Sequence, residues 1–442
     1  MGKKIIFLFL LGFWLKTNAQ EIRTLKQCIA YGLKNNRNTT IYANEKVAAE
    51  ARAKEVLADY LPGISLTSTL DNNLRLQQLV IPAGVFGPDE FRGSLTQKYN
   101  SDLVAQVDQV IYDHSILTRL KANKYSKQQA DLNIQQIQET IIYNVSIAYF
   151  RIFVYNQQLE LLEYNRESYE KQLEIYRLQV SKGIILQKDL DQVSVDYNNT
   201  ISQIRVARSN LQLAENELKY EMGYPIYDPL TVCFSGEMEL PLLPDDSTDL
   251  FSPALRIDYK LAGINIKVLE TEQSRIRAEA LPKLSAYFRY GAVGFGDNLK
   301  SAYDELLPYS TAGLKLSIPV LDFYKRSARY KQAKIERINA EERLKLAEGK
   351  YTVAYENART QLLQAQANVE NDKRNVTLAE SVLKITDLQL QKGTTSLTDW
   401  LNTQSALKEA QNSYLNSLHT YYQARIKLEK AAGTLKTFYN SL

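Results

Sequence analysis

Apolar residues recur at spacings of three and four over two stretches of unusual length. The first runs from about His114 to Lys182, and Arg166 is the only polar residue in its series, which includes Ile134, Ile137, Ile141, Val145, Ala148, Ile152, Leu162, Tyr169, Leu173 and Tyr176. Such spacing is typical of a coiled-coil seam. At ~1.5 Å per residue, a helix of ~68 residues is a rod of ~100 Å. A second stretch of ~70 residues on the same pattern ends at Lys392.

Four shorter segments alternate apolar and polar residues, which predicts strands with one apolar and one mostly polar side. We expect these strands at residues 64–80, 99–111, 284–296 and 311–321. In the last of them, Leu314 and Leu316 alternate with Gly313, Lys315 and Ser317. Half-length helices are predicted at 24–60, 189–222, about 252–281 and 399–432.

Both long helical stretches end at a Lys-Gly pair, Lys182-Gly183 and Lys392-Gly393, and an Asp follows six residues after each Gly. Gly supplies the left-handed residue that ends a helix. We expect Asp189 and Asp399 to be the N-caps that begin the next helix, because a carboxylate accepts the free N–H groups there. Each motif therefore predicts a helical hairpin.

The two hairpin motifs lie nearly half the chain apart, and other landmarks recur at a similar interval, such as Gly223 and Gly433. The sequence therefore predicts an internal duplication. Repeat 1 covers residues 20–223 and repeat 2 covers residues 251–442, with a Pro-rich connector at 224–250. Two half-length helices together match one long helix, so we expect them to stack end to end beside it, with the connector at the equator.

The first residues predict export. Lys3 and Lys4 precede an apolar run from Ile5 to Leu15, and Thr17-Asn18-Ala19 provides a cleavage site, so residues 1–19 are read as a signal peptide. The mature chain is close to neutral, which gives no basis for nucleic-acid binding. No later window is typical of a transmembrane helix, so any membrane insertion is expected to use strands.

Candidate chemistry is sparse. The chain has two histidines, His114 and His419, and no metalloprotease, redox or nucleophile-elbow spacing, so we expect neither an enzyme nor a cofactor. Cys28 and Cys233 are the only cysteines; two unpaired thiols and a single bridge both remain open.

Two-sided strands in an exported protein suggest a β-barrel in an outer membrane. Four strands cannot close a barrel, because the smallest need about eight, so several chains must share one. A barrel with a polar interior, continued by a helical tube, is a conduit. The predicted fold is mainly α with a small β part.

The order of these elements resembles the TolC family of outer-membrane efflux and secretion channels. The resemblance is strongest from Gly393-Thr394-Thr395 through Asp399-Trp400-Leu401-Asn402 to Gly433. It implies a homotrimer with a shared twelve-stranded barrel in the outer-membrane lipid of a Gram-negative bacterium, and a periplasmic helical tunnel. It also implies partners, namely a periplasmic adaptor protein and, through it, an inner-membrane pump.

By position, the resemblance implies that the hairpin tips at Lys182, Gly183, Lys392, Gly393 and Thr394 dock the adaptor, and that Asp189 and Asp399 lie near a narrow entrance. Thr395 and Asn402 stand where the best-known member has an Arg and a second Asp, so its closing network is not carried over. Three copies of Asp399 around an axis would repel one another, raise each other's pKa and favour cations. A capping role alone is the other interpretation.

Two other classes remain as alternatives, an exported coiled-coil adaptor and a fibrous structural protein without a pore. The first lacks a compact β-rich domain beside a single hairpin, and the second leaves the paired strands unexplained. The sequence does not identify the exported cargo.

Overall fold

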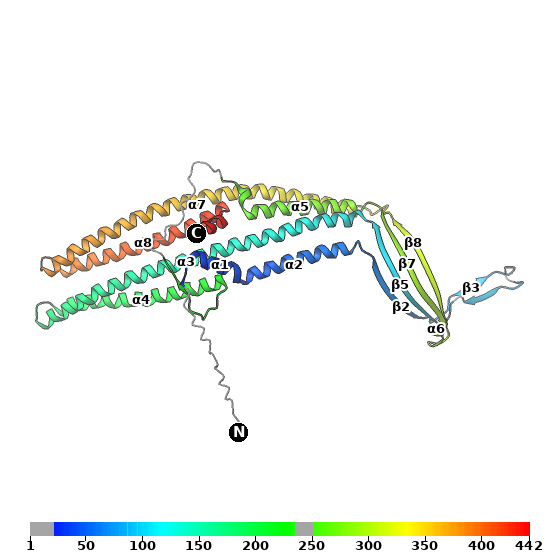
Figure 1. Cartoon of the computed structure of the whole chain (residues 1–442), viewed down its shortest axis with the longest axis horizontal. Helices are drawn as coiled ribbons and strands as arrows, with labels where there is room; N and C mark the ends of the chain where they lie inside the picture. Colours follow the sequence, from blue (N-terminus) through cyan, green and yellow to red (C-terminus); the bar gives the residue numbers. More distant parts are fainter. Residues whose placement is uncertain (1–21, 86, 95, 235–250) are drawn as a thin grey trace, which may run out of the picture. The chain divides into compact units, whose positions relative to one another are not determined.

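The computed structural model describes residues 22–85, 87–94, 96–234 and 251–442 (Figure 1). The predicted signal peptide and most of the predicted connector lie outside these residues. The mainly helical fold with a small β part is confirmed. The elements are, in chain order, β1 (Ile22–Arg23), α1 (Leu25–Asn35), α2 (Arg37–Ala58), β2 (Gly63–Asn72), β3 (Gln78–Ile81), β4 (Phe91–Ser94), β5 (Tyr99–Tyr112), α3 (His114–Ser181), α4 (Gln187–Met222), β6 (Thr231–Val232), the 3₁₀ turn η1 (Pro253–Leu255), α5 (Ile257–Ala278), β7 (Lys283–Gly296), α6 (Ser301–Asp304), β8 (Leu306–Ser317), α7 (Lys325–Gln391), α8 (Leu397–Ala432) and α9 (Leu435–Ser441).

Two compact units divide the chain, and each takes segments from both halves of the sequence. Unit 1 comprises the chain up to Tyr42, Ile134–Tyr259 and Ala347–Leu442, and unit 2 comprises Ala43–Asn133 and Lys260–Leu346. The boundaries of the two sequence repeats remain a prediction.

The predicted long helices are confirmed: α3 has 68 residues and α7 has 67. The predicted seam of α3 is buried over much of its length, at Ile141, Val145, Ala148, Ile152, Leu162, Tyr169, Leu173 and Tyr176. Its middle forms the main core of unit 1 with apolar residues of α1, α4, α8 and α9. The short helix α9 was not predicted; it buries Leu435 and Phe438 against this core.

The prediction of one helix over residues 24–60 is wrong, because the helix breaks at Asn36. Asn36 is extended (φ −63°, ψ 130°) and buried. Its Nδ2 donates to the carbonyl of Glu221 at 2.7 Å, and its Oδ1 accepts the N–H of Asn38 at 2.9 Å. The side chain therefore satisfies the N–H of Asn38, which a continuous helix would have paired, and also binds a carbonyl at the end of α4, so α1 and α2 are separate helices.

Unit 2 holds a four-stranded sheet in the order β2-β5-β7-β8, with every neighbouring pair antiparallel. The predicted strands 99–111 and 284–296 match β5 and β7. The predicted strand 64–80 is wrong in its second half. The ladder of β2 ends at Asn72, and Asn73 closes it by donating from its N and Nδ2 to the carbonyls of Lys98 and Gln97, both at 2.8 Å. The following residues form a separate hairpin, β3–β4.

The predicted strand 311–321 is displaced along the chain, because β8 begins at Leu306 and ends at Ser317. Pro308 lies inside the strand opposite Ala292. A proline is tolerated there because β8 is an edge strand, and one side of its backbone has no strand partner among the described residues. The strand ends before Pro319, which has no N–H to extend a ladder.

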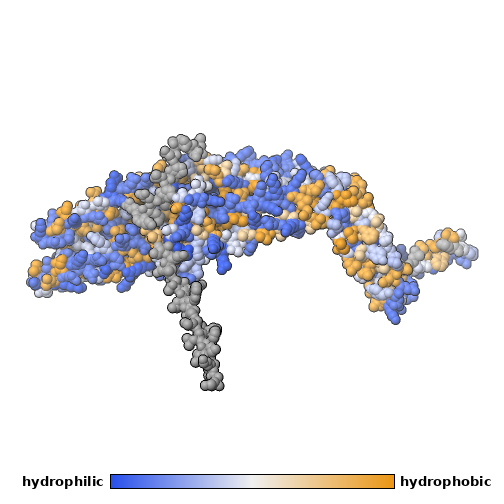
Figure 2. All heavy atoms as spheres, in the orientation of Figure 1, coloured by the Kyte–Doolittle hydropathy of each residue, from blue (hydrophilic) through white to orange (hydrophobic). Residues whose placement is uncertain are grey.

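The two faces of this sheet differ in chemistry, as the alternation predicts. On one face, the Nε of Arg289 donates to the Oε1 of Gln106 at 2.9 Å, and the Nε2 of Gln106 donates to Asp108 at 2.7 Å. In Figure 2, hydrophobic residues are visible on the surface over the strands of the sheet. By cross-strand register, the apolar face carries Ile64, Leu66 and Leu70 of β2, Leu103, Ala105 and Val107 of β5, Phe288 and Tyr290 of β7, and Ala312 and Leu314 of β8.

Candidate functional site

Both helical hairpins turn at a glycine with the same backbone geometry. Gly183 and Gly393 each have φ of 72°, so the predicted left-handed residues are confirmed. After each glycine, the N–H of Ile184 or Thr394 donates to the carbonyl five residues earlier, that of Gln179 or Gln389, at 2.9 Å in both turns. This is the Schellman motif, which satisfies the last carbonyls of a helix. The tip residues Lys182, Gly183, Lys392, Gly393 and Thr394 are all exposed.

Asp189 is not the N-cap of α4, so that prediction is wrong. The helix begins at Gln187, and the N-cap is Leu186, which makes no side-chain capping bond. Asp189 lies in the first turn, where its N–H donates to the carbonyl of Leu186 at 3.0 Å. A carboxylate there still stabilises the helix through the helix dipole.

Asp399 is also displaced from the predicted N-cap position, which belongs to Ser396. The N–H of Asp399 donates to the Oγ of Ser396 at 3.1 Å, and the Oγ and N of Ser396 donate to the Asp399 carboxylate at 2.7 and 3.4 Å. The Oγ1 of Thr395 adds a donor at 3.2 Å. These hydrogen bonds hold the pKa of Asp399 below its usual range. This reciprocal capping box could have been recognised from the Ser-x-x-Asp spacing.

One apolar cluster lies behind both turns and joins the two hairpins. It buries Tyr169 of α3, Val193 of α4, Leu383 of α7 and Trp400 of α8. Trp400 is 1% exposed and meets the Tyr169 ring edge to face at 5.8 Å. Ile185 of the first turn and Leu397 beside the second turn pack on the same cluster. The two tips are therefore held at one end of unit 1, and Figure 1 shows the hairpins running side by side.

A buried polar layer crosses the seam between α3 and α8, and the sequence reading missed it. Asn165 is 1% exposed; its Nδ2 donates to the Oε1 of Gln411 at 2.9 Å, and its Oδ1 accepts from Gln404 at 3.3 Å. The predicted seam residue Arg166 instead lies at the surface, where it pairs with Glu163 and Glu170. Polar residues inside a seam fix the register of the two helices.

Of the remaining candidates, Asn402 is exposed on α8, one turn beyond Asp399. The structure therefore brings Thr395 and Asp399 into contact and leaves Asn402 and Asp189 outside that hydrogen-bond network.

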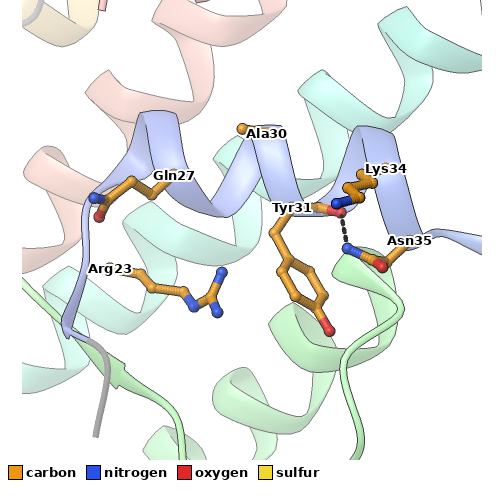
Figure 3. Close-up of a pocket in the computed structure, with 6 residues that line it drawn as sticks. All are labelled: Arg23, Gln27, Ala30, Tyr31, Lys34 and Asn35. Carbon is orange, nitrogen blue, oxygen red and sulfur yellow. Dashed lines mark hydrogen bonds between the residues drawn. The ribbon is translucent and has the colours of Figure 1, made fainter. Parts of the chain in front are cut away.

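A cavity of about 400 Å³ lies beside α1 and is lined by Arg23, Gln27, Ala30, Tyr31, Lys34 and Asn35 (Figure 3). The guanidinium carbon of Arg23 lies 4.5 Å from the centre of the Tyr31 ring and 5.7 Å from that of Tyr224. The two tyrosine rings are 5.4 Å apart. Arg23 thus packs against both aromatic rings and links Tyr31 of α1 to Tyr224, the residue after Gly223. We assign no ligand to this cavity.

Metal chemistry has no visible centre in the part of the chain that the structure describes. Within it, no group of three or more His, Cys, Asp or Glu side chains could hold a metal ion. Burial lowers the pKa of His419, whose Nε2 lies 2.8 Å from the Nε2 of Gln423. Cys28 and Cys233 are free thiols, and burial raises the pKa of Cys28 to about 12.

The described helices include none that is both long and apolar enough to span a bilayer.

Comparison with known proteins shows which families and structures the chain resembles. The sequence model of the family described as outer membrane efflux protein matches residues 276–434. The outer membrane protein TolC of Salmonella enteritidis is 22% identical over 337 residues, which cover 75% of this chain and 68% of the relative. The alkaline protease secretion protein AprF of Pseudomonas aeruginosa is 23% identical over 337 residues, covering 74% of this chain and 69% of the relative.

A solved structure of CusC, from a study of its folding and transmembrane channel formation, has the same fold. It aligns with a TM-score of 0.76 at 17% identity and covers 92% of this chain and 91% of that chain. The paired Gly turns, the open four-stranded sheet and these matches agree with one another. Over residues 276–434 the chain matches the outer membrane efflux protein family, and together these findings support a TolC-type outer membrane efflux channel.

Proposed function

We propose that the chain is one subunit of an outer-membrane channel that exports small molecules or proteins from the periplasm, in an efflux or type I secretion assembly. The observation that carries this proposal is the open sheet of unit 2. Its strands alternate in direction and its edges, β2 and β8, have no partner within the described chain. All ten residues of β2 are exposed.

Edge strands with free backbone groups favour pairing with another chain. Because β2 and β8 run in opposite directions, β8 of one copy can pair antiparallel with β2 of the next. Three copies, as the family resemblance implies, would give twelve strands, which is within the range of known membrane barrels. The apolar face of the sheet would then contact lipid, and the face with Arg289, Gln106 and Asp108 would line the lumen.

The hairpin tips are the proposed adaptor-docking surface. Lys182, Gly183, Lys392, Gly393 and Thr394 are exposed and carried by rigid Schellman turns. Asp189, Thr395, Asp399 and Asn402 would lie near the entrance. In this proposal the adaptor links the channel to an inner-membrane pump, and the pump selects the cargo.

A direct test of the channel is extraction in mild detergent followed by gel electrophoresis with and without heating. We expect a heat-sensitive oligomer that forms ion-conducting pores in planar lipid bilayers. A chain that stays monomeric, or that forms an oligomer without conductance, would exclude the channel.

Two variants separate the two roles of Asp399. Asp399→Asn removes the charge that three copies would bring together, whereas Ser396→Ala weakens the same capping box and keeps the charge. We expect Asp399→Asn to reduce the cation preference of the pore and Ser396→Ala to leave it unchanged. Equal selectivity in both variants and the unmodified channel would leave Asp399 with a capping role only.

A further inference from the structure

Two tyrosine side chains on the polar face of the sheet lie over glycines of a neighbouring strand. Tyr287 of β7 pairs with Gly313 of β8, and Tyr309 of β8 pairs with Gly291 of β7, so the two pairs cross the same two strands in opposite directions. All four residues share a face with Arg289, because residues two apart on a strand point to the same side. A glycine inside a strand weakens the strand, and it often marks a place where another group approaches closely.

The side chain of Tyr287 lies across Gly313. A Cβ at Gly313 would come within 2.6 Å of both the Cζ and the Oη of Tyr287. The far end of the tyrosine therefore occupies the space that a side chain at position 313 would need. The guanidinium carbon of Arg289 lies 5.1 Å from the centre of the same ring, and its Nε donates to Gln106 of β5. Both long side chains thus run along the sheet instead of standing away from it.

Tyr309 has the same arrangement in the opposite direction. A Cβ at Gly291 would lie 3.1 Å from the Cε1 and the Cζ of Tyr309, and the hydroxyl of Tyr309 donates to the Oδ1 of Asp102 at 3.3 Å. Asp102 belongs to β5, so this side chain crosses the whole width of β7. A Cβ at Gly291 would also lie 2.7 Å from a backbone oxygen of β5, so an alanine there would strain the sheet as well as move the ring.

We propose that Gly313 and Gly291 keep the lumen of the barrel wide, because they give the side chains of Tyr287 and Tyr309 a place against the wall. The inference rests on the proposed oligomeric channel, since only a closed barrel makes this face the lining of a lumen. Three copies of the chain would place three Tyr287 rings at one level. Upright rings would narrow the lumen there, so the glycines determine how large a cargo can pass.

The sheet contains a matched control for Gly313. Gly63 of β2 pairs with Asp108 of β5, and Asp108 pairs with Tyr287. Since Tyr287 pairs with Gly313, the two glycines lie in one row across the sheet. Neither glycine has a left-handed φ, so alanine can adopt both backbone conformations. A Cβ at Gly63 would meet nothing within 4 Å, whereas the three atoms nearest to a Cβ at Gly313 all belong to the Tyr287 side chain.

The test measures how large a reagent can pass the Tyr287 row. Ser317 is exposed, shares the face of Gly313 and ends β8, at the end of the sheet where the strands join the helices. Maleimides on polyethylene glycol chains of graded length are added outside intact cells that carry Ser317→Cys. They enter from the opposite end of the barrel and must pass the row to react. The unmodified chain, which carries Cys28 and Cys233, gives the background, and the mass of the isolated chain on a gel reports the labelling.

We expect Gly313→Ala to shift the size limit to shorter polymers, because its methyl group lifts the Tyr287 ring into the lumen. Gly63→Ala should keep the limit of the Ser317→Cys chain, because it adds the same methyl group at the same level without touching a ring. Tyr287→Ala should restore the limit in the Gly313→Ala chain and leave it unchanged when made alone.

Three results would overturn the proposal: an equal limit in Gly313→Ala and Gly63→Ala, no restoration by Tyr287→Ala, or a longer limit in Tyr287→Ala alone. The last result would mean that the ring already projects into the lumen. It also decides the question if Gly313→Ala does not assemble, because Tyr287→Ala alone leaves the glycine in place.

The two proposals fail separately in this experiment. If the unmodified chain forms no oligomer in the outer membrane, the proposed channel is wrong. If the oligomer forms and Ser317→Cys is labelled, but the size limit does not follow the Tyr287 ring, only the role of the glycines is wrong.

Discussion

Three glycines that end helices offer a graded test of how backbone angle and space each constrain this fold. Gly183, Gly223 and Gly433 have φ of 72°, 67° and 77°, so an alanine at any of them takes up nearly the same left-handed strain. That strain costs ~1–2 kcal/mol for a residue with a Cβ. Alanine also reduces the conformational entropy of the unfolded chain, which stabilises the folded state by ~0.4–1 kcal/mol. The angle alone therefore predicts a loss of ~1 kcal/mol at each site.

The space around the three glycines differs. A Cβ at Gly183 would meet nothing within 4 Å, whereas at Gly433 it would lie 3.2 Å from the backbone of Arg256. At Gly223 it would lie 2.6 Å from the carbonyl oxygen of Asn35. This backbone cannot move easily, because the neighbouring Asn36 is bonded to Glu221. Overpacking adds ~1–3 kcal/mol, so we expect losses of ~1, ~2 and ~3–4 kcal/mol for Gly183→Ala, Gly433→Ala and Gly223→Ala.

The assay is urea unfolding of the detergent-solubilised chain without residues 1–19. Trp400 is then its only tryptophan, so its fluorescence reports the hairpin cluster, while circular dichroism reports all helices. Gly393→Ala is the replicate, because Gly393 has the φ of Gly183 and equally open surroundings. If Gly183→Ala proved as destabilising as Gly223→Ala, the close approach of Asn35 would have no energetic weight and the reasoning would be refuted.

Three further predictions concern the hairpin region. Trp400→Ala should lower the free energy of unfolding by ~3–5 kcal/mol, because it empties a buried site, and Trp400→Phe should restore part of that loss, both followed by circular dichroism during urea unfolding because the fluorescent residue is gone. Asn165→Ala should cost ~1–3 kcal/mol by leaving buried amides without a partner, and a smaller effect than that of an exposed alanine substitution would contradict the polar layer. The pKa of Asp399 is lower in the folded chain than in the unfolded chain, where it is ~3.9. Its hydrogen bond with Ser396 therefore contributes its full stabilisation of α8 at pH values above ~3.9, and that stabilisation is lost as the pH falls through the lower pKa of the folded state. Hydrogen exchange should therefore show the first turn of α8 opening in acid, and Asp399→Asn should remove that pH dependence.

Long periodic segments were the part of the fold that the sequence could predict. Apolar residues at spacings of three and four over the whole of α3 fit only a helix. A glycine at the end of such a pattern is best explained as the left-handed residue that ends the helix. The alternation in β5 and β7 was equally clear, because these central strands have partners on both sides.

Short-range competition explains what could not be predicted. At Asn36, one side chain competes with the helix for backbone groups, and its distant partner Glu221 is invisible in a local pattern. The start of β8 was missed at Leu306, and Pro308 lies within this strand because an edge position tolerates a proline. At the candidate site, Asp399 was correctly placed at the start of a helix, but its dependence on Ser396 was overlooked. Asn165 was missed because its amide partners lie on another helix, far along the chain.

The even number of strands in the sheet has a consequence for stoichiometry. Since the first and last strands point in opposite directions, every seam between subunits is antiparallel whatever the number of subunits in the ring. Strand direction therefore does not determine the number of subunits in the ring. That number depends instead on the curvature of the barrel wall and on how neighbouring helices pack. Substitutions on the helical surfaces could change the size of the ring while leaving each strand pairing intact.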